Sequence, residues 1–216
     1  YARIPEFPGE TSGGGNAVTE ALARLRLLVE DEPFRRFVIA RSLLLCSALS
    51  APFYVLLARE RIGGEHWLLG LFVLSAGLAS LLAAPFWGRF ADRSSRQVMV
   101  VGGAISGGIG AVIVLADRLA PGLVASTWFV PLAYFILSIA HDGVRVGRKT
   151  YVVDLAGGNK RTDYVAVSNT VIGVVLLVTG LIGLLTPLIG TGGVILALSL
   201  MGLAGASLSA ALPEVQ

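Results

Sequence analysis

The chain has 216 residues, of which 55% are hydrophobic and 14% are charged, and its formal net charge is +3 at pH 7. Soluble domains carry about 25% charged residues, so this composition, with a mean hydropathy of +0.77, excludes an ordinary soluble domain and is typical of a protein embedded in lipid. The single cysteine, Cys46, lies inside an apolar run, which excludes a disulfide framework and a cysteine-based metal site.

The N-terminal region differs in composition from the rest of the chain. Residues 1–16 contain two prolines and a triple glycine, which predict a flexible linker. The next stretch, residues 17–33, has apolar residues at helical spacing but is too short and too charged to cross a membrane. We expect an amphipathic helix at the membrane surface or against a partner domain. Residues 1–36 are therefore predicted to be a cytoplasmic linker, and residues 37–216 a transmembrane bundle.

Six apolar stretches follow, each long enough to cross about 30 Å of hydrocarbon as a helix. They lie at about residues 37–58, 67–87, 98–116, 127–154, 164–189 and 194–212. None shows the period-two alternation of a barrel strand. The sequence therefore predicts an all-α fold: a polytopic membrane protein with a bundle of six transmembrane helices.

Positive charge is distributed unequally between the two sides of this predicted bundle. Of the 17 Lys and Arg residues, only Arg59, Arg61 and Arg118 fall on one side, and the other 14 fall on, or just inside, the opposite side. Cytoplasmic loops carry the excess of Lys and Arg. The sequence therefore predicts that both termini are cytoplasmic, in a bacterial-type inner (plasma) membrane.

The loop between the second and third spans, residues 88–97, reads GRFADRSSRQ. Charge that only sets the topology needs no particular order, but this order resembles motif A of the major facilitator superfamily, with Ser95 and Gln97 departing from the family pattern. The positions that match are Gly88, Asp92, Arg93 and Arg96. The resemblance implies that the glycine allows close helix approach. It also implies that the aspartate accepts hydrogen bonds from a helix N-terminus of the opposite half and pairs with nearby arginines.

The resemblance implies a fold of twelve spans in two six-helix repeats. Residues 1–36 are similar to the family's central loop, so the chain resembles helices seven to twelve, with the N-terminal six-helix half as its partner; a half that pairs with itself is the second interpretation. The implied function is secondary transport of a small solute by alternating access, with H⁺ as a candidate coupling ion. The alternative class is a six-helix membrane protein that does not transport: a structural bundle, a receptor or an intramembrane enzyme module.

The fourth span contains three ionisable residues, His141, Asp142 and Arg145. Asp142 lies about 22 Å along a helix that begins at Thr127, and ionisable residues at that depth usually face the bundle interior or a water-filled cavity. One interpretation is a coupling or substrate cluster, in which Asp142 carries a proton or pairs with Arg145, and His141 titrates nearest neutrality. In the other, the helix has reached the membrane interface by Asp142 and the cluster is simply cytoplasmic.

Further polar residues allow two interpretations each. The stretch after the fourth span is similar to the family's link between the fourth and fifth helices of a repeat, and its candidates for cytoplasmic salt bridges are Arg148, Asp154 and Arg161; ordinary solvated loop charge is the alternative. In the first span, Arg41 is placed to extend to the interface, and the residues placed to line a polar cavity are Ser47, Ser50 and Tyr54. Asn169, in the fifth span, is equally ambiguous.

Glycines cluster in the third, fifth and sixth spans, and Gly103 and Gly107 form a GxxxG pair. Small residues of this kind allow helices to pack closely in membranes, so we predict a packing role for them.

Several function classes have no support in the sequence. No phosphate-binding P-loop is present, which argues against an ATP-driven pump within this chain. His66 and His141 lie on opposite sides of the predicted topology and cannot share a metal. No nucleophile is paired with a base, and the basic residues lack the interleaved aromatics of a nucleic-acid surface. We therefore expect no enzyme activity, no cofactor, no metal and no nucleic-acid partner.

Overall fold

The structure is a computed structural model that describes residues 24–64, 66–157 and 160–215. These residues contain helices and no strand. The elements are α2 (Leu27–Glu30), α3 (Glu32–Leu43), α4 (Cys46–Leu49), α5 (Ala51–Ile62), α6 (His66–Ala91), α7 (Ser95–Leu119), α8 (Pro121–Val124), α9 (Phe129–Leu155), α10 (Arg161–Gly180), the 3₁₀ helix η2 (Leu181–Leu185) and α11 (Thr186–Ala210). The linker predicted over 1–16 and the first part of the predicted amphipathic helix lie outside the described residues.

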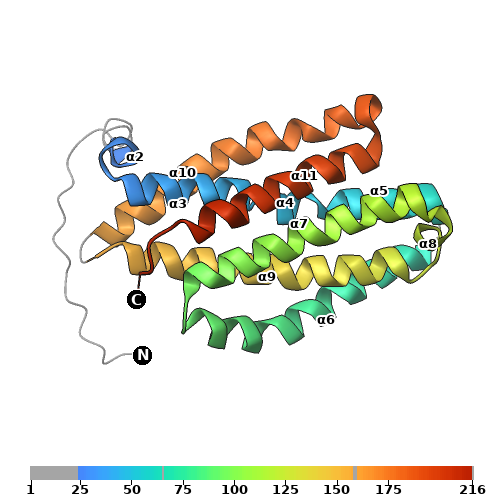
Figure 1. Ribbon diagram of the computed structural model, residues 1–216, viewed down its shortest axis with the longest axis horizontal. Helices are drawn as coiled ribbons and strands as arrows, with labels where there is room; N and C mark the ends of the chain where they lie inside the picture. The colour runs from blue at the N-terminus through green and yellow to red at the C-terminus, as the bar shows by residue number, and fades with distance from the viewer. Residues whose placement is uncertain (1–23, 65, 158–159, 216) are drawn as a thin grey trace, which may run out of the picture.

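Five segments of the described chain are long and apolar enough to cross a membrane. The last of them, Arg161–Ala210, has 50 residues and contains α10, η2 and α11. Figure 1 shows that the chain doubles back between α10 and the main length of α11. Gly190, with φ 73° and ψ 167°, interrupts the helical backbone, so this segment supplies two passes. The described residues thus form six membrane-spanning passes, which confirms the predicted all-α membrane bundle.

The first pass is a helix with two interruptions rather than one regular rod. It comprises α3, α4 and α5, and its backbone N–H groups at Leu45, Ser47 and Ala48 bond to carbonyls three residues back instead of four. A second break comes at Ser50, where Pro52 occupies the first turn of α5. Proline is tolerated in a first turn because the N–H that it lacks has no partner there.

The two ends of the bundle carry different charges. The helix α3 begins and α11 ends at the end where the α6–α7 loop also lies (Figure 1). We call this the basic end, because the residues there include Arg35, Arg36, Arg89, Arg93, Arg96, Lys149 and Arg161. The other end, which we call the opposite end, carries Arg59, Arg61 and Arg118. The helices therefore separate the basic residues as the sequence predicts.

Helix α7 lies at the centre of the packing, with α11 on one side and α9 on the other, and α6 packs against α9. The GxxxG pair sits in these contacts. A Cβ added at Gly103 would lie 2.5 Å from Cδ2 of Leu44, and one added at Gly107 would lie 2.7 Å from the carbonyl oxygen of Ser199. Neither position has room for a side chain. The predicted packing role of Gly103 and Gly107 is confirmed.

The end of the fifth pass agrees with its prediction. Helix α10 ends at Gly180, but the chain stays helical through η2 and the first residues of α11. The helical backbone is interrupted at Gly190 (φ 73°, ψ 167°), next to the predicted end of the span at about residue 189. The packing role predicted for the glycines of this span stays a prediction for Gly173 and Gly180, since a Cβ added there would meet nothing of the described chain within 4 Å. The second half of α10 carries exposed apolar side chains instead, among them Leu177 and Val178.

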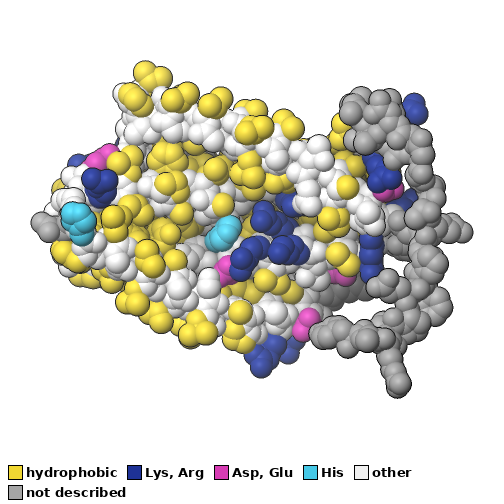
Figure 2. All heavy atoms as spheres, turned by 180° about the vertical axis from the view of Figure 1, so that it is seen from behind, with side chains coloured by type: hydrophobic (Ala, Val, Ile, Leu, Met, Phe, Trp, Pro, Cys, Tyr) yellow, Lys and Arg dark blue, Asp and Glu magenta, His cyan; other side chains and the backbone are white. Residues whose placement is uncertain are grey.

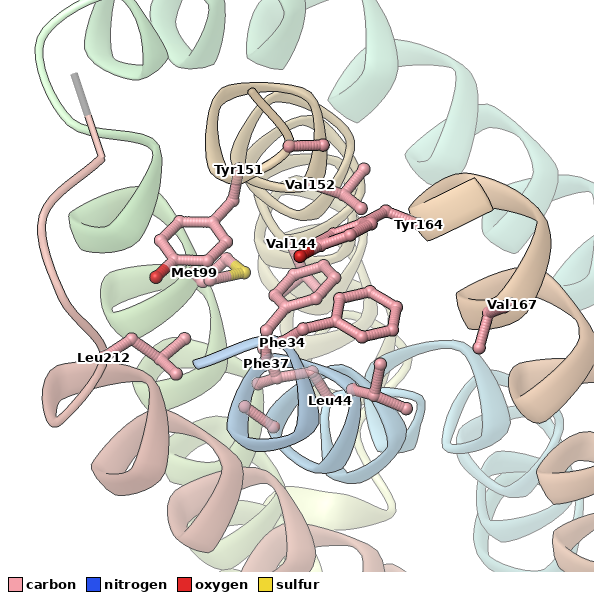
Figure 3. Close-up of a cluster of buried hydrophobic side chains, with 13 residues drawn as sticks. Phe34, Phe37, Leu44, Met99, Val144, Tyr151, Val152, Tyr164, Val167 and Leu212 are labelled. Carbon is pink, nitrogen blue, oxygen red and sulfur yellow. The ribbon is translucent and has the colours of Figure 1, made fainter. Parts of the chain in front are cut away.

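A buried aromatic cluster joins the helices at the basic end (Figure 3). The rings of Phe37 and Tyr151 stack with centroids 5.1 Å apart, and those of Phe34 and Tyr164 lie 4.3 Å apart. Asp31 caps α3 by accepting a 2.9 Å hydrogen bond from the backbone N–H of Phe34, and it also accepts one from the Tyr164 hydroxyl. These contacts fix α3 against α9 and α10.

Candidate functional site: a polar cavity and a charged loop

The loop that resembles motif A is tied to the C-terminal segment. Ser94 caps α7 by accepting a 3.1 Å hydrogen bond from the backbone N–H of Gln97, and its hydroxyl donates a 2.5 Å bond to Oε1 of Glu214. Arg96 Nε lies 2.7 Å from Oε2 of the same carboxylate, and Arg96 Nη1 donates to the carbonyl oxygen of Leu212 at 3.1 Å. Glu214 thus connects the loop to the segment that follows α11.

Other residues of the predicted motif have no partner inside the described part of the chain. The side chains of Asp92 and Arg93 are exposed and form no hydrogen bond or ion pair with those residues. Gly88 lies within α6, and a Cβ added there would meet nothing within 4 Å. Its predicted role in close helix approach therefore stays a prediction, for a neighbour outside this chain.

The structure brings His141, Asp142 and Arg145 together with two serines from other helices. Asp142 is 6% exposed; its Oδ1 lies 2.8 Å from Nη2 of Arg145, and its Oδ2 accepts a 2.8 Å hydrogen bond from the hydroxyl of Ser80 in α6. His141 Nδ1 lies 3.1 Å from the hydroxyl of Ser47 in α4. The carboxylate is therefore bonded on both oxygens and held between α6 and α9.

The pairing with Ser80 gives the depth of Asp142 in the bundle. Ser80 lies in the middle of α6, about 20 Å along the helix from Trp67 and about 13 Å from Arg89, at a rise of about 1.5 Å per residue. The α6 residues between these markers include no charged side chain. Because Asp142 bonds to Ser80, its carboxylate lies at that depth too. This position favours the cluster interpretation over a helix that has already reached the interface.

A cavity of about 230 Å³ lies beside this cluster. Its polar lining residues are Ser47, Ser80, Tyr134, Ser138, His141 and Asp142. The residues thus come from the first pass, α6 and α9. Of the three first-span residues predicted to line a cavity, Ser47 does; Ser50 and Tyr54 are buried and do not appear among its lining residues.

Two further arginines continue the polar cluster toward the basic end. Arg41 is 8% exposed; its Nη1 donates to the Ser168 hydroxyl at 2.6 Å and its Nη2 to Oδ1 of Asn169 at 2.8 Å. It therefore bonds to α10 rather than extending to the interface. Arg148 lies close enough to Arg41 to repel it electrostatically. Figure 2 shows basic side chains gathered beside a histidine and an acidic side chain in the middle of a largely apolar face.

Asp154 and Arg161, predicted to form cytoplasmic salt bridges, are exposed and line a cavity of about 690 Å³ at the basic end, together with Asp92 and Glu214. Neither forms an ion pair with another described residue, and Arg148 does not pair with them. The predicted salt bridges stay predictions.

Several contacts between distant segments could not be predicted from the sequence. At the opposite end, Arg61 holds Asp117 by two bonds, Nε to Oδ1 at 2.6 Å and Nη2 to Oδ2 at 2.8 Å. Thr191 donates to Oε1 of Glu60 at 2.6 Å. These contacts join α5 to α7 and α11. No local pattern marks such pairs, because each depends on how remote helices meet.

No group of three or more His, Cys, Asp and Glu side chains suited to a metal ion occurs in the part of the chain that the structure covers. The chemistry of the site is that of a charged, hydrogen-bonded cavity, which can hold a small polar solute or a proton.

Six membrane-crossing passes (Figure 1) define an integral membrane protein. The sequence profile of the Major Facilitator Superfamily matches residues 21–215. The chain therefore belongs to this family of transporters. A search of curated proteins found no match to the chain.

Proposed function

We propose that this chain is the C-terminal six-helix half of a secondary transporter that moves a small solute by alternating access. The observation that carries this proposal is the cavity beside His141 and Asp142. It lies between the first pass, α6 and α9, and is lined by serine hydroxyls and a tyrosine. Its lining residue Asp142 pairs with Arg145 of the polar cluster.

The exposed position of this cluster supports a second half. Side chains such as Arg145, with half of its side-chain surface exposed, are costly against hydrocarbon, and ionisable residues in membranes face a bundle interior or water. On either side of the cluster, α6 and α10 expose large apolar residues. A face that combines a polar centre with apolar borders suits contact with another protein surface enclosing a water-filled cavity.

The partner that we propose for this face is the N-terminal six-helix half of the same transporter. The sequence of residues 1–36, with its prolines and triple glycine, suits a connection between two halves. A second copy of this chain is the alternative partner. The gene upstream of Tyr1 distinguishes the two: six more apolar spans with their own motif after the second support the proposal, and a soluble domain there contradicts it.

The loop at 88–97 supports a gating role in this proposal. The carboxylate of Asp92 has no partner among the described residues, so it is free to accept hydrogen bonds from the other half in one state of the transporter and to release them in another. We place the basic end in the cytoplasm of a bacterial-type inner membrane, because cytoplasmic loops are enriched in Lys and Arg. Reporter fusions in the 92–94 loop test this orientation, and a periplasmic signal there contradicts it.

We propose that Asp142 couples transport to a proton gradient by binding and releasing a proton. Arg145 is the counter-ion that Asp142 releases on protonation, and His141 is a neighbour that adjusts the proton affinity of this pair. The test is Asp142→Asn in the full-length protein in vesicles, with Asp117→Asn at the opposite end as the matched control. We expect Asp142→Asn to abolish gradient-driven transport and Asp117→Asn to retain it. Unchanged gradient-driven transport and an unchanged pH profile in Asp142→Asn contradict the coupling role.

A further inference from the structure

The charges of the polar cluster do not balance. The polar cluster contains three arginines, Arg41, Arg145 and Arg148, and one acid, Asp142, which pairs with Arg145. Among the described residues, Arg41 bonds to a hydroxyl and an amide, and Arg148 forms no ion pair. With His141 neutral, the cluster therefore carries two positive charges that nothing in the described chain compensates.

The arginines are arranged in register along two antiparallel segments. On α9, Arg148 follows His141 by seven residues, which places it on the same helix face about 10 Å nearer the basic end. On the first pass, Arg41 precedes Ser47 by six residues, a rise of about 9 Å. Because Ser47 bonds to His141, Arg41 and Arg148 lie at about the same depth in the bundle, on the basic-end side of that contact. The arginine pair thus lies about 9–10 Å from Ser47 and His141, which line the 230 Å³ cavity, on the side toward the basic end.

The unused hydrogen-bond donors of this pair are buried. The Nε atoms of Arg41 and Arg148 are inaccessible and have no hydrogen-bond partner among the described residues. A buried donor without an acceptor costs free energy, and an uncompensated buried charge costs more. A neutral or cationic occupant would leave both costs in place. An anionic group would remove them, because guanidinium groups bind carboxylates and phosphates with paired, charge-assisted hydrogen bonds.

We propose that the transported solute is a small organic anion whose carboxylate or phosphate group binds between Arg41 and Arg148, on the basic-end side of the 230 Å³ cavity beside Ser47 and His141. This inference rests on the proposed transport function. It assigns the two arginines as anion-binding residues and separates them from Asp142 and Arg145, which already pair with each other.

The test measures ligand-induced thermal stabilisation of the purified full-length protein, and solute uptake into phosphatidylcholine vesicles. The probes are inorganic phosphate, lactate and succinate, with lactamide and succinamide as neutral counterparts and choline as a cation. The variants are Arg148→Gln, Arg148→Lys and, as a matched control, Arg118→Gln, which removes an exposed arginine at the opposite end. A second arm adds phosphatidylglycerol to the vesicles, because a lipid phosphate offers the same chemistry.

We expect at least one anion to stabilise the protein and to be taken up, whereas its neutral counterpart does neither. Arg148→Gln should weaken that anion's apparent affinity by about 30-fold or more, Arg148→Lys by less, and Arg118→Gln not at all. Without ligand, Arg148→Gln should be as stable as the wild type or more stable, because it removes an uncompensated charge. A purely structural arginine would instead lose stability in that variant.

Four outcomes would overturn the inference. Uptake restricted to neutral or cationic solutes refutes the anion class and leaves the transporter proposal standing. Stabilisation by phosphatidylglycerol alone assigns the site to a lipid. Anion affinity unchanged in Arg148→Gln shows that the arginine pair does not bind the solute, as expected if a carboxylate of the second half occupies it. Failure of every probe both to stabilise the protein and to enter the vesicles also refutes it. Absence of any gradient-driven transport in intact cells would separately contradict the proposed function.

Discussion

Helices α6 and α9 pack closely at Gly143, where the side chain of Trp87 leaves no room for a Cβ atom. A Cβ added there would lie 2.5 Å from Cε2 and 2.8 Å from Cδ2 and Cζ2 of Trp87. Carbon atoms in ordinary contact lie about 3.5–4.0 Å apart, so Gly143→Ala requires a displacement of about 1 Å between helix and indole.

The indole ring of Trp87 cannot easily move by that distance. It is 1% exposed, and its Nε1–H donates a 2.8 Å hydrogen bond to the carbonyl oxygen of Ile139. Overpacking of this kind costs about 1–3 kcal/mol, and loss of the hydrogen bond adds about 1 kcal/mol. Alanine returns about 1 kcal/mol through its better helix propensity. The net expectation for Gly143→Ala is a loss of about 1–3 kcal/mol in unfolding free energy.

The assay is thermal unfolding of the full-length protein followed with a thiol-reactive dye, because Cys46 is 2% exposed and becomes accessible on unfolding. Any other cysteine of the full-length chain is first replaced by serine. The matched control is Gly108→Ala in α7, where an added Cβ meets nothing within 4 Å, so this variant should unfold at or slightly above the wild-type temperature. Replacing Trp87 by Phe should relieve the clash and reduce the cost of Gly143→Ala. Equal stability of Gly143→Ala and wild type would refute the reasoning, as would an equal loss in both alanine variants.

Two smaller predictions follow from polar contacts at the two ends. Ser94→Ala should lower the unfolding free energy by about 0.5–2 kcal/mol through loss of the α7 cap. Limited proteolysis should also cleave the segment around Glu214 sooner, because its hydrogen bond to Ser94 is lost. An unchanged rate of proteolysis would contradict the role of that hydrogen bond in holding the segment. Breaking the ion pair by Arg61→Ala, Asp117→Ala or both should give a coupling energy of about 1 kcal/mol or less that shrinks in high salt, measured by a double-mutant cycle. A larger, salt-independent coupling would contradict that expectation.

The spans were predictable because crossing a bilayer imposes a length and a composition on each helix. The separation of Lys and Arg into two groups was equally visible. The turn between the fifth and sixth passes was visible too, as the gap between the predicted spans 164–189 and 194–212, and the helical backbone is interrupted there at Gly190. The 3₁₀ stretch Leu181–Leu185 was not visible, because hydropathy does not distinguish a 3₁₀ turn from the α-helix on either side of it.

The candidate site was predictable only in part. His141, Asp142 and Arg145 stand out because charge inside a span is costly. Their partners Ser47 and Ser80 do not, since a serine in an apolar helix commonly bonds to its own backbone, and only the meeting of three helices shows which serine faces a carboxylate. The grouping of Arg41 with Arg148 depends on the same antiparallel register.

The broken first pass has a mechanical consequence. One end of this pass is fixed by Asp31 and the aromatic cluster, and its other end is fixed by Arg61 and Glu60. Between them, from Leu45 to Ala48 and beside the cavity at Ser47, backbone N–H groups bond three residues back, at distances of 3.0 to 3.4 Å. Short 3₁₀ stretches within helices often mark hinges. A segment clamped at both ends and compliant at its midpoint bends there first, so movement of the bundle would be concentrated at the point where a solute would sit.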